Sequence, residues 1–385
     1  MFERIYAGRR VLITGHTGFK GSWLAAWLTL LEARVAGLAL DPNEDQPMYA
    51  SLGLAERLIA DHRIDIRDRE AVAQVVEREQ PEFVFHLAAQ PLVRQSYAEP
   101  AETFETNVLG VTNVLEEVRR KGRPYVIVVA TTDKCYENRN TDEGYREDDR
   151  LGGRDPYSAS KACAELVVAS YRQSFFADCQ QVKLASARAG NVIGGGDWSR
   201  DRIVPDAVRA LRCGEPIRVR NRGSTRPWQH VLEPLSGYLW LAATMARPEL
   251  VEQPDARRLC GAFNFGPLKE SHRAVAQLVE ELLTHMPGSW TDAPEAAAPH
   301  EAGKLHLAID KARELLAWRP AWNFAEAVRA TAAWYQAEQQ GENLWRTTHE
   351  QIRDYQVAAR AAGIPWVGKC EFLLPAQQAL SVRTL

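Results

Sequence analysis

Residues 9 to 190 alternate short apolar, β-branched runs with helix-like stretches, and this alternation constrains the fold of the 385-residue chain more than any other feature. The apolar runs are RRVLITG, RVAGLALD, HRIDI, FVFHLAA, YVIVVATT and QVKLASARAG. The helix-like stretches include residues 19–31, 69–79, 103–121 and a segment that follows Pro156. Such alternation predicts an α/β protein with a doubly wound parallel sheet and helices on both faces. Ligands of such sheets bind at the carboxyl ends of the strands.

The chain changes character near residue 194, where Gly194, Gly195 and Gly196 are followed by basic and proline-containing stretches and shorter helices. We therefore predict a domain over 1–193 that binds a cofactor and carries the catalytic residues. Residues 194–385 are predicted to form mainly a smaller α/β lobe for the substrate, with some chain crossing back to the sheet. Residues 137–155 and 287–304 are predicted loops. The first lies between two candidate catalytic elements, so it is either a lid or a solvated loop.

Charge and cysteine content exclude several classes of partner. Lys and Arg number 47 against 50 Asp and Glu, for a net charge of −3, which argues against nucleic acid or an anionic membrane as the main partner. The N-terminal MFERIYAGRR lacks a signal-peptide apolar core, and Glu32 and Arg34 interrupt the most apolar stretch. The six cysteines show no C-x-x-C pair, so neither a zinc site nor a disulfide framework is indicated. We expect a cytoplasmic protein without a metal.

A glycine-rich turn predicts where the cofactor binds. In RRVLITGHTGFKGSWL, Gly15, Gly18 and Gly21 lie between a predicted strand and a predicted helix. Glycines there permit a tight turn and let backbone N–H groups approach a pyrophosphate at the helix N-terminus. The spacing is G-x-x-G-x-x-G rather than G-x-G-x-x-G, but the strand–turn–helix context indicates a Rossmann-type dinucleotide site. The same turn adds the candidates Thr17, Phe19 and Lys20.

The ends of later strands supply further cofactor candidates. Asp41 ends the second strand, where its carboxylate would accept hydrogen bonds from a ribose and repel a 2′-phosphate, which favours NAD over NADP. The alternative is that Asp41 is a turn residue before Pro42. Candidates to hold the adenine and to flank the cofactor backbone are Asp65, Ile66, Leu87, Ala88 and Ala89.

Two stretches carry candidate catalytic groups. VVATTDKCYEN places Thr132, Asp133 and Lys134 after a buried strand, where they are either a surface turn or part of a site. DPYSASKACAELV places Tyr157 and Lys161 at i, i+4, on one face of a helix. A phenol with a pKa of about 10 is a poor base at neutral pH, and an adjacent ammonium stabilises its phenolate. Thr132 is placed to share the substrate proton.

Several motifs together resemble the extended short-chain dehydrogenase/reductase superfamily over nearly the whole chain. They are GHTGFKG, HLAAQ, TNVLG around Asn107, YSASK and the segment 307–335. Within it, TTDKCYEN, RAGNVIGGGDW and RPWQHV are similar to CDP-glucose 4,6-dehydratases, although Ser is expected where Thr132 stands. The resemblance implies conversion of CDP-glucose to CDP-4-keto-6-deoxyglucose and water, by C4 oxidation, C5/C6 elimination and hydride return to C6, with tightly held NAD. It places Asn107, Tyr157 and Lys161 among the cofactor-binding residues.

The resemblance also implies roles for the Asp133–Lys134 pair and for the quaternary structure. Eliminating water needs an acid for the C6 oxygen, for which Asp133 is the candidate, and a base for the C5 proton, for which Lys134 is the candidate. A desolvated pocket favours the neutral form of each, whereas adjacency favours ionisation, so the base assignment stays open. Helices 103–121 and 157–175 are expected to form a homodimer. The product would feed deoxysugar synthesis for bacterial surface polysaccharides such as the lipopolysaccharide O-antigen.

Cationic and aromatic residues are candidates to bind the substrate. Those in the second lobe, for the nucleotide, are Arg202, Arg226, Trp228 and His230. Asn191 would hydrogen-bond the diphosphate or the sugar, and Gln90 and Arg94 would face the hexose. Each is alternatively an ordinary surface or structural residue. Nothing physical in these residues distinguishes cytosine from thymine or uracil.

Two competing functions share most of these features. A nucleotide-sugar epimerase or decarboxylase has the same fold and the same Tyr–Lys pair, but an epimerase has no elimination for Asp133 and Lys134 to perform. A non-catalytic NAD-sensing regulator on this fold has no need of Tyr157 and Lys161, and both are present.

Overall fold

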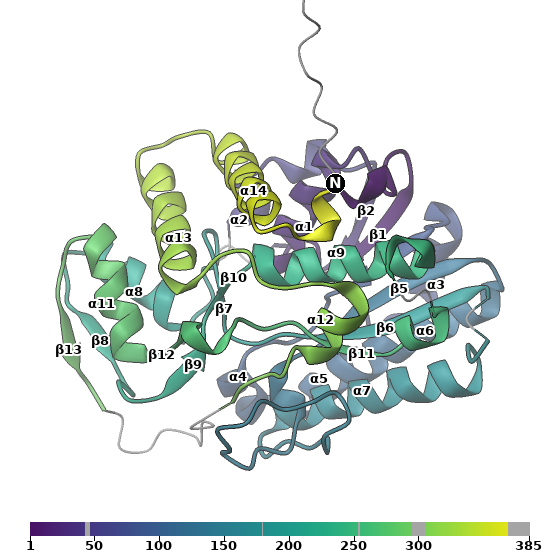
Figure 1. Ribbon diagram of the computed structural model, residues 1–385, viewed down its shortest axis with the longest axis horizontal. Helices are drawn as coiled ribbons and strands as arrows, with labels where there is room; N and C mark the ends of the chain where they lie inside the picture. Colours follow the sequence, from purple (N-terminus) through teal and green to yellow (C-terminus); the bar gives the residue numbers. More distant parts are fainter. Residues whose placement is uncertain (43–46, 179, 253–254, 295–304, 369–385) are drawn as a thin grey trace, which may run out of the picture.

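A seven-stranded parallel sheet forms the centre of the computed structural model (Figure 1), which describes residues 1–42, 47–178, 180–252, 255–294 and 305–368. In spatial order its strands are β11 (Ala262–Asn264), β6 (Val182–Arg188), β5 (Tyr125–Ala130), β4 (Phe83–His86), β1 (Arg10–Thr14), β2 (Arg34–Ala39) and β3 (Ala60–Arg63). The order reverses between β1 and β4, which is the switch point where doubly wound sheets bind ligands. The predicted fold class is confirmed.

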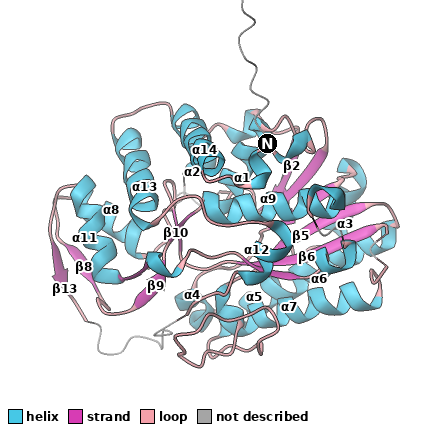
Figure 2. Ribbon diagram, in the orientation of Figure 1, coloured by secondary structure: helices cyan, strands magenta, loops and turns pink. Residues whose placement is uncertain are grey.

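Helices cover both faces of the sheet, as the alternating pattern predicts (Figure 2). One apolar core holds side chains of α3 (Arg69–Glu79), α6 (Gly110–Lys121) and α7 (Pro156–Ser174). The other holds side chains of α1 (Phe19–Leu30), α9 (Leu232–Ala246) and α14 (Leu344–Ala361). Because parallel strands are buried on both faces, they read as continuous apolar runs in the sequence.

The second lobe is built around three two-stranded sheets. They pair β7 (Val192–Ile193) with β10 (Gln229–His230), β9 (Thr225–Pro227) with β12 (His272–Ala274), and β8 (Ile217–Val219) with β13 (Trp290–Asp292). Besides α9 and α14, this half contains α8 (Ile203–Arg212), α11 (Val275–His285), α12 (Asp310–Leu316) and α13 (Phe324–Gln339). The chain crosses back to the sheet through β11 and through α9, which packs against β5. The division at residue 193 stays a prediction.

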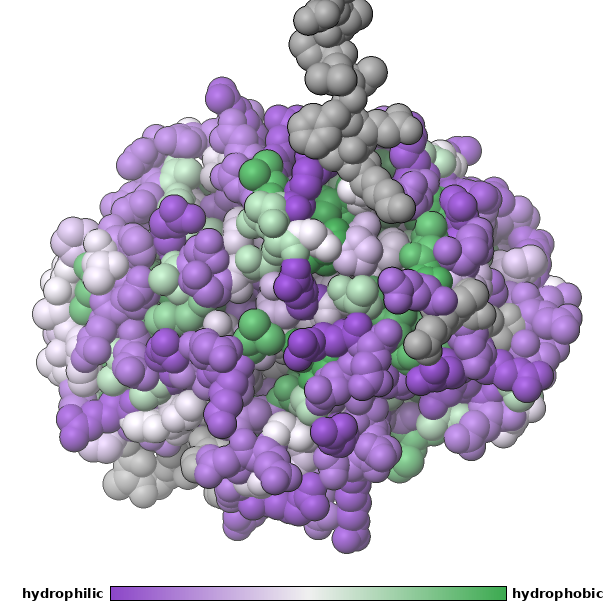
Figure 3. Space-filling model, in the orientation of Figure 1, coloured by the Kyte–Doolittle hydropathy of each residue, from purple (hydrophilic) through white to green (hydrophobic). Residues whose placement is uncertain are grey.

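Short elements complete the chain. They are α2 (Met48–Ser51), α4 (Val93–Ala98), α5 (Pro100–Phe104), α10 (Ala256–Leu259), η1 (Phe2–Arg4), η2 (Leu54–Glu56), η4 (Asp133–Cys135), η5 (Pro248–Leu250), η6 (Lys269–Ser271) and η7 (Pro365–Val367). No helix in the described ranges has the length and apolar character to cross a bilayer. The face shown in Figure 3 is largely hydrophilic, with small scattered apolar patches.

The predicted helix over 103–121 is not one regular α-helix. It comprises the end of α5, a π-helical turn η3 (Glu105–Leu109) and α6. The buried Asn107 side chain projects from this turn, and its Nδ2 donates to Ser160 Oγ of α7 at 2.9 Å. A π-turn of this kind is common near functional sites.

The two predicted loops differ in how far the structure describes them. In the segment 137–155, the side chain of Tyr145 is buried and stacks on that of Tyr136, with ring centroids 5.2 Å apart. The backbone of Tyr145 forms an isolated β-bridge with Leu307. The segment is therefore packed, not merely solvated, and its role as a lid stays a prediction. Of the loop predicted over 287–304, residues 290–292 form β13, and residues 295–304 lie outside the described residues.

A buried ion pair joins α7 to the sheet. Arg188 Nη2 of β6 and Glu165 Oε2 of α7 are 2.8 Å apart, and both side chains are almost completely buried. Thr131 Oγ1 and Ser186 Oγ donate to the same carboxylate at 2.5 and 2.8 Å. Burial opposes the charged carboxylate, but Arg188 and these hydroxyl groups hold the pKa of Glu165 below its usual range. The pair therefore stays ionised.

We expect Glu165→Gln to lower the free energy of unfolding by about 3–5 kcal/mol, because Arg188 would keep its charge in a buried site without its partner. Denaturant unfolding at neutral pH measures this change. The control is Glu350→Gln, which breaks the exposed pair of Glu350 with Arg346 and should cost less than about 1 kcal/mol. Equal effects of the two substitutions would contradict the role given to the buried pair.

Candidate active site

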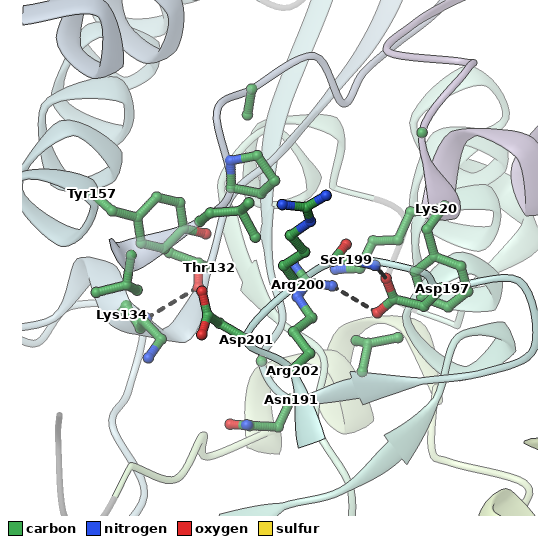
Figure 4. Close-up of a pocket in the computed structure, with 18 of the residues that line it drawn as sticks. Lys20, Thr132, Lys134, Tyr157, Asn191, Asp197, Ser199, Arg200, Asp201 and Arg202 are labelled. Atoms are coloured by element: carbon green, nitrogen blue, oxygen red, sulfur yellow. Dashed lines mark hydrogen bonds and ion pairs between the residues drawn. The ribbon is translucent and has the colours of Figure 1, made fainter. Parts of the chain in front are cut away.

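A cavity of about 690 Å³ lies where the carboxyl ends of the sheet strands face the second lobe. Most of the predicted site residues line it: Gly15, Thr17, Gly18, Phe19, Lys20, Gly21, Asp65, Ile66, Leu87, Ala88, Ala89, Arg94, Thr132, Asp133, Lys134, Tyr157, Lys161, Asn191, Arg202, Arg226 and Trp228. Figure 4 shows Tyr157, Thr132 and Lys134 on one side, Lys20 and Asp197 on the other, and Arg202 between them. One cavity therefore unites the residues predicted for cofactor, catalysis and substrate.

The glycine turn between β1 and α1 has the shape that a dinucleotide requires. Gly15 has a φ of +76°, and a Cβ there would lie 2.7 Å from the backbone nitrogen of Ala88. A Cβ on Gly21 would lie 2.1 Å from the carbonyl oxygen of Gly15. Gly18 is the N-cap of α1 and has no side chain to satisfy the first N–H groups of the helix. A diphosphate fits these N–H groups and the positive end of the helix dipole.

Of the two acidic residues predicted to bind the adenosine, only Asp65 lies on the cavity wall. Asp65 lines it, and the hydrogen bond from Arg67, with Nη2–Oδ2 at 2.6 Å, lowers the pKa of that carboxyl. Asp41 does not line the cavity. Its side chain is 88% exposed, and its Oδ1 lies 3.8 Å from Arg63 Nε. Contact of Asp41 with a ribose stays a prediction.

The catalytic candidates Thr132, Asp133 and Lys134 occupy the short turn η4 directly after β5. Thr132 Oγ1 accepts from the backbone N–H of Lys134 at 3.3 Å and donates to Asp133 Oδ1 at 3.0 Å. Asp133 is 1% exposed, whereas Lys134 is half-buried. The turn thus buries the acid and leaves the amine nearer to the opening of the cavity.

Tyr157 and Lys161 project into the cavity from the first turns of α7, which Asp155 caps by accepting from the Ser158 N–H. Burial raises the pKa of Tyr157 to about 12, against the lowering effects of a Thr132 hydrogen bond and of Arg202. Burial also lowers the pKa of Lys161 to about 8, and the Glu165 carboxylate opposes this shift. In the free protein desolvation therefore outweighs the activation of Tyr157 that the i, i+4 spacing predicts.

The cavity wall carries two further cations, both half-buried. Burial, helped by the nearby Arg202 guanidinium, lowers the pKa of Lys20 to about 8, and Asp133 opposes it. Arg202 is held by Asp197, with Nη1–Oδ2 at 2.9 Å, so that its guanidinium has a fixed place on the wall. Both cations suit an anionic ligand.

The remaining substrate candidates come from α4, from β9 and from the segments that precede β7 and β10. Arg226 of β9 is buried and donates to the carbonyl of Thr225 at 3.1 Å. Trp228 Nε1 donates to the carbonyl of Arg273 at 3.0 Å. Asn191 has a φ of +44°, and Arg94 Nε lies 3.6 Å from Asp201 Oδ1. All four line the cavity.

Besides Asp41, three further predicted site residues lie off the cavity wall. His230 is completely buried between Trp23 and Trp322, with ring centroids 5.7 and 5.0 Å away, and burial lowers its pKa to about 3. The prediction that His230 binds the nucleotide is corrected, because its ring belongs to the core.

Gln90 and Asn107 are likewise structural. The Gln90 side chain donates to Thr103 Oγ1 at 2.9 Å, and Asn107 Oδ1 accepts from the Gln90 backbone N–H at 2.8 Å. These bonds brace the loop after β4 against α5 and η3. Direct contacts of Gln90 with a hexose and of Asn107 with the cofactor are therefore not supported, and both residues position the cavity wall instead.

Other wall residues were not predicted from the sequence. The polar and charged ones include Asp197, Ser199, Arg200, Asp201, Arg218 and Arg220. Four of them follow Gly196 within the stretch DWSRD, whose dense charges are the one sequence signal that identifies them. Arg218 and Arg220 lie on and just after β8, a strand too short for periodicity to reveal.

Comparisons with known proteins agree with this geometry. The family model described as GDP-mannose 4,6 dehydratase matches residues 12–331. The chain is 43% identical over 362 residues to a CDP-glucose 4,6-dehydratase of Salmonella typhimurium, which covers 92% of this chain and 98% of that protein. This match confirms the family that the sequence motifs predict.

Two solved structures show the shared fold. A UDP-glucose 4-epimerase of Thermotoga maritima has a TM-score of 0.72 at 23% identity and covers 86% of this chain and 99% of its own. A dTDP-glucose 4,6-dehydratase of Streptomyces venezuelae, solved with NAD bound, has a TM-score of 0.72 at 22% identity. It covers 87% of this chain and 99% of its own. From the family match and the relative of 43% identity, the chain belongs to the nucleotide-sugar 4,6-dehydratase family described as GDP-mannose 4,6 dehydratase.

Proposed function

We propose that the protein is an NAD-dependent CDP-glucose 4,6-dehydratase, a hydro-lyase that converts CDP-glucose to CDP-4-keto-6-deoxyglucose and water. The observation that carries the proposal is that Asp133 and Lys134 line the same cavity as Tyr157 and Lys161. The second pair is what sugar oxidation requires, and the first pair adds an acid and a base that elimination requires. The name of the Salmonella relative supports the choice of substrate.

In the oxidation, Tyr157 takes the proton from the C4 hydroxyl while Thr132 hydrogen-bonds the same oxygen. Lys161, one helical turn later, stabilises the phenolate by its charge. The chemistry that NAD supplies when bound is reversible hydride transfer, first from C4 and finally to C6. The buried walls of the cavity exclude water from the reacting carbons.

In the elimination, the C4 ketone acidifies the C5 hydrogen, and Lys134 as a neutral amine removes it. Asp133, as a carboxylic acid, donates its proton to the C6 oxygen as the C6–O bond breaks. Water leaves and a C5–C6 double bond remains. The proton on Lys134 then returns to C5 when C6 is reduced. The proton that Tyr157 took from the C4 hydroxyl replaces, through solvent, the one that Asp133 gave to the C6 oxygen, so that the enzyme is restored and the overall change is the loss of one water.

The nucleotide diphosphate would be held by the cations of the second lobe. Arg202 and Arg226 line the cavity, and a guanidinium grips phosphate oxygens bidentately. Trp228, on the same wall, offers an indole face to a base. These groups suit any nucleoside diphosphate, so the choice of cytidine rests on the relative.

The proposal is tested by incubating the purified protein with NAD and CDP-glucose, and separately with dTDP-glucose, UDP-glucose and GDP-mannose. Mass spectrometry follows the loss of one water from each sugar nucleotide, and Tyr157→Phe is the matched inactive control. We expect dehydration of CDP-glucose alone. Dehydration of another sugar nucleotide would overturn the substrate but keep the reaction class, and no dehydration of any would favour an epimerase.

Lys161 gives the reaction a predicted pH dependence. Its folded-state pKa is about 8, so the ammonium is present below this pH and is lost above it. We expect kcat/KM, which reports ionisations of the free enzyme, to fall about tenfold per pH unit on the alkaline side of pH 8, because the neutral amine no longer stabilises phenolate.

Glu165→Gln provides the comparison for this pH profile. The Glu165 carboxylate raises the pKa of Lys161, so its removal should move the alkaline limb of the kcat/KM profile to lower pH. An unchanged limb in this variant would contradict the assignment of the limb to Lys161.

The cellular setting belongs to the same proposal. The described cysteines Cys135, Cys163 and Cys213 have free thiols, as suits a reducing cytoplasm. The 4-keto-6-deoxy product would supply deoxysugars for surface polysaccharides such as the O-antigen.

We further propose a homodimer through the helices predicted over 103–121 and 157–175. Leu109 of η3 and Leu166 of α7 are 53% and 58% exposed, although both lie on helices whose other faces pack in the core. Apolar side chains exposed on adjacent helices suit contact with a second copy.

Leu166→Glu should therefore convert the dimer to a monomer, because it places a charge in the apolar contact. Sedimentation equilibrium at micromolar concentration measures the mass of each form. The control is Val357→Glu on α14, which is equally exposed but lies on a different helix, and it should leave the dimer intact. A monomeric wild-type protein, or a dimer in both variants, would count against this interface.

A further inference from the structure

The carboxyl group of Asp133 has one oxygen engaged and one oxygen without a partner. Oδ1 accepts from Thr132 Oγ1 at 3.0 Å. Oδ2 is buried and has no hydrogen-bond partner among the residues that the structure describes. A buried carboxyl oxygen without a partner costs free energy, and proteins keep such groups mainly where a ligand or a reaction uses them.

The space around this carboxyl group exists because residue 190 has no side chain. A Cβ on Gly190 would lie 1.8 Å from Asp133 Oδ2, 2.1 Å from Cγ and 2.6 Å from Oδ1. All three nearest atoms belong to the same carboxyl group. No side chain larger than hydrogen fits at residue 190 unless the Asp133 carboxyl group or the backbone moves.

The backbone at residue 190 is itself held in place. Gln229 of β10 is buried, and its Nε2 donates to the carbonyl of Gly190 at 3.0 Å and to that of Phe265 at 3.2 Å. Its backbone N–H donates to the carbonyl of Asn191 at 3.3 Å. Gln229 therefore ties the turn after β6 to β10 and to the segment after β11, which opposes a retreat of Gly190 from Asp133.

We infer that Gly190 is a positioning residue that sets the location of the Asp133 carboxyl group and thereby permits elimination in addition to oxidation. The effect on elimination rests on the proposed function, whereas the close approach of residue 190 to the Asp133 carboxyl group does not depend on it. Tyr157, Thr132 and Lys161 carry out the oxidation, whereas the three atoms nearest to a Cβ at residue 190 all belong to Asp133. A side chain at residue 190 would thus impair the elimination and leave the oxidation in place.

The inference predicts the behaviour of Gly190→Ala. The added methyl group would displace the carboxyl group, so that water loss from CDP-glucose should fall about 10²–10⁴-fold, the range typical of a lost general acid. Oxidation should persist, so the near-ultraviolet absorbance of the reduced cofactor should rise on mixing with substrate. Gly223→Ala is the control, because a Cβ there meets nothing within 4 Å, and it should leave water loss and Tm unchanged.

A double-mutant cycle with Asp133→Ala tests whether Gly190 acts through Asp133. Asp133→Ala removes the three atoms that would lie nearest to the new methyl group. Gly190→Ala should therefore lower Tm by roughly 3 °C or more in the wild-type background, yet have little effect in the Asp133→Ala background. The loss of water-elimination activity should likewise not increase in the double variant.

Each outcome of the cycle decides the inference separately from the proposed function. Additive losses of Tm would show that Gly190 does not contact Asp133 as described, and loss of oxidation in Gly190→Ala would show that it disturbs the whole site. Either result would overturn the inference even if the wild-type protein dehydrates CDP-glucose. If the wild-type protein dehydrates no sugar nucleotide, the proposed function fails, and the Tm cycle still decides the contact.

Discussion

The buried pair of Arg188 and Glu165 joins the elements on which the active site depends. Arg188 is on β6 and Glu165 is on α7, two helical turns beyond Tyr157 and one beyond Lys161. Hydrogen bonds extend the pair to Thr131, directly before Thr132, so one buried carboxylate fixes both segments that carry catalytic candidates. A charge in this place would be costly alone, and it is stabilised only with its partner and hydroxyl donors all present.

The same pair reaches toward the second half of the chain. Arg188 Nη1 donates to the hydroxyl of Tyr136 at 2.7 Å, and this hydroxyl donates to Asn264 Oδ1 at 2.8 Å. Asn264 ends β11, the strand that returns from the second lobe to the edge of the sheet. The lobes are therefore joined through buried polar groups directly behind the catalytic turn, and a loosening of this network would act on the geometry of Thr132 and Asp133.

The sequence predicts those parts of the fold and site that depend on local chemistry. The glycine turn, the strand ends and the Tyr157–Lys161 spacing each follow from residues a few positions apart, and the structure brings them to one cavity. The π-turn at Asn107 could not be predicted, because it depends on bonds to Ser160 and Gln90, far away in the sequence. His230 has the same difficulty, since a histidine in a polar stretch gives no sign of the two tryptophans that enclose it.

The cavity places cations where burial disfavours their charge. Burial lowers the pKa of both Lys20 and Lys161 to about 8, and Arg202 keeps its charge beside them through Asp197. If nearby carboxylates fully neutralised these three cations, the cavity would not attract an anionic ligand. Because the local acids only partly offset these cations, a diphosphate that enters the cavity gains attraction in a medium of low dielectric constant. The free energy spent on burying charge in the free protein is thus recovered when an anionic ligand binds, which favours tight binding of a nucleotide over that of a neutral sugar.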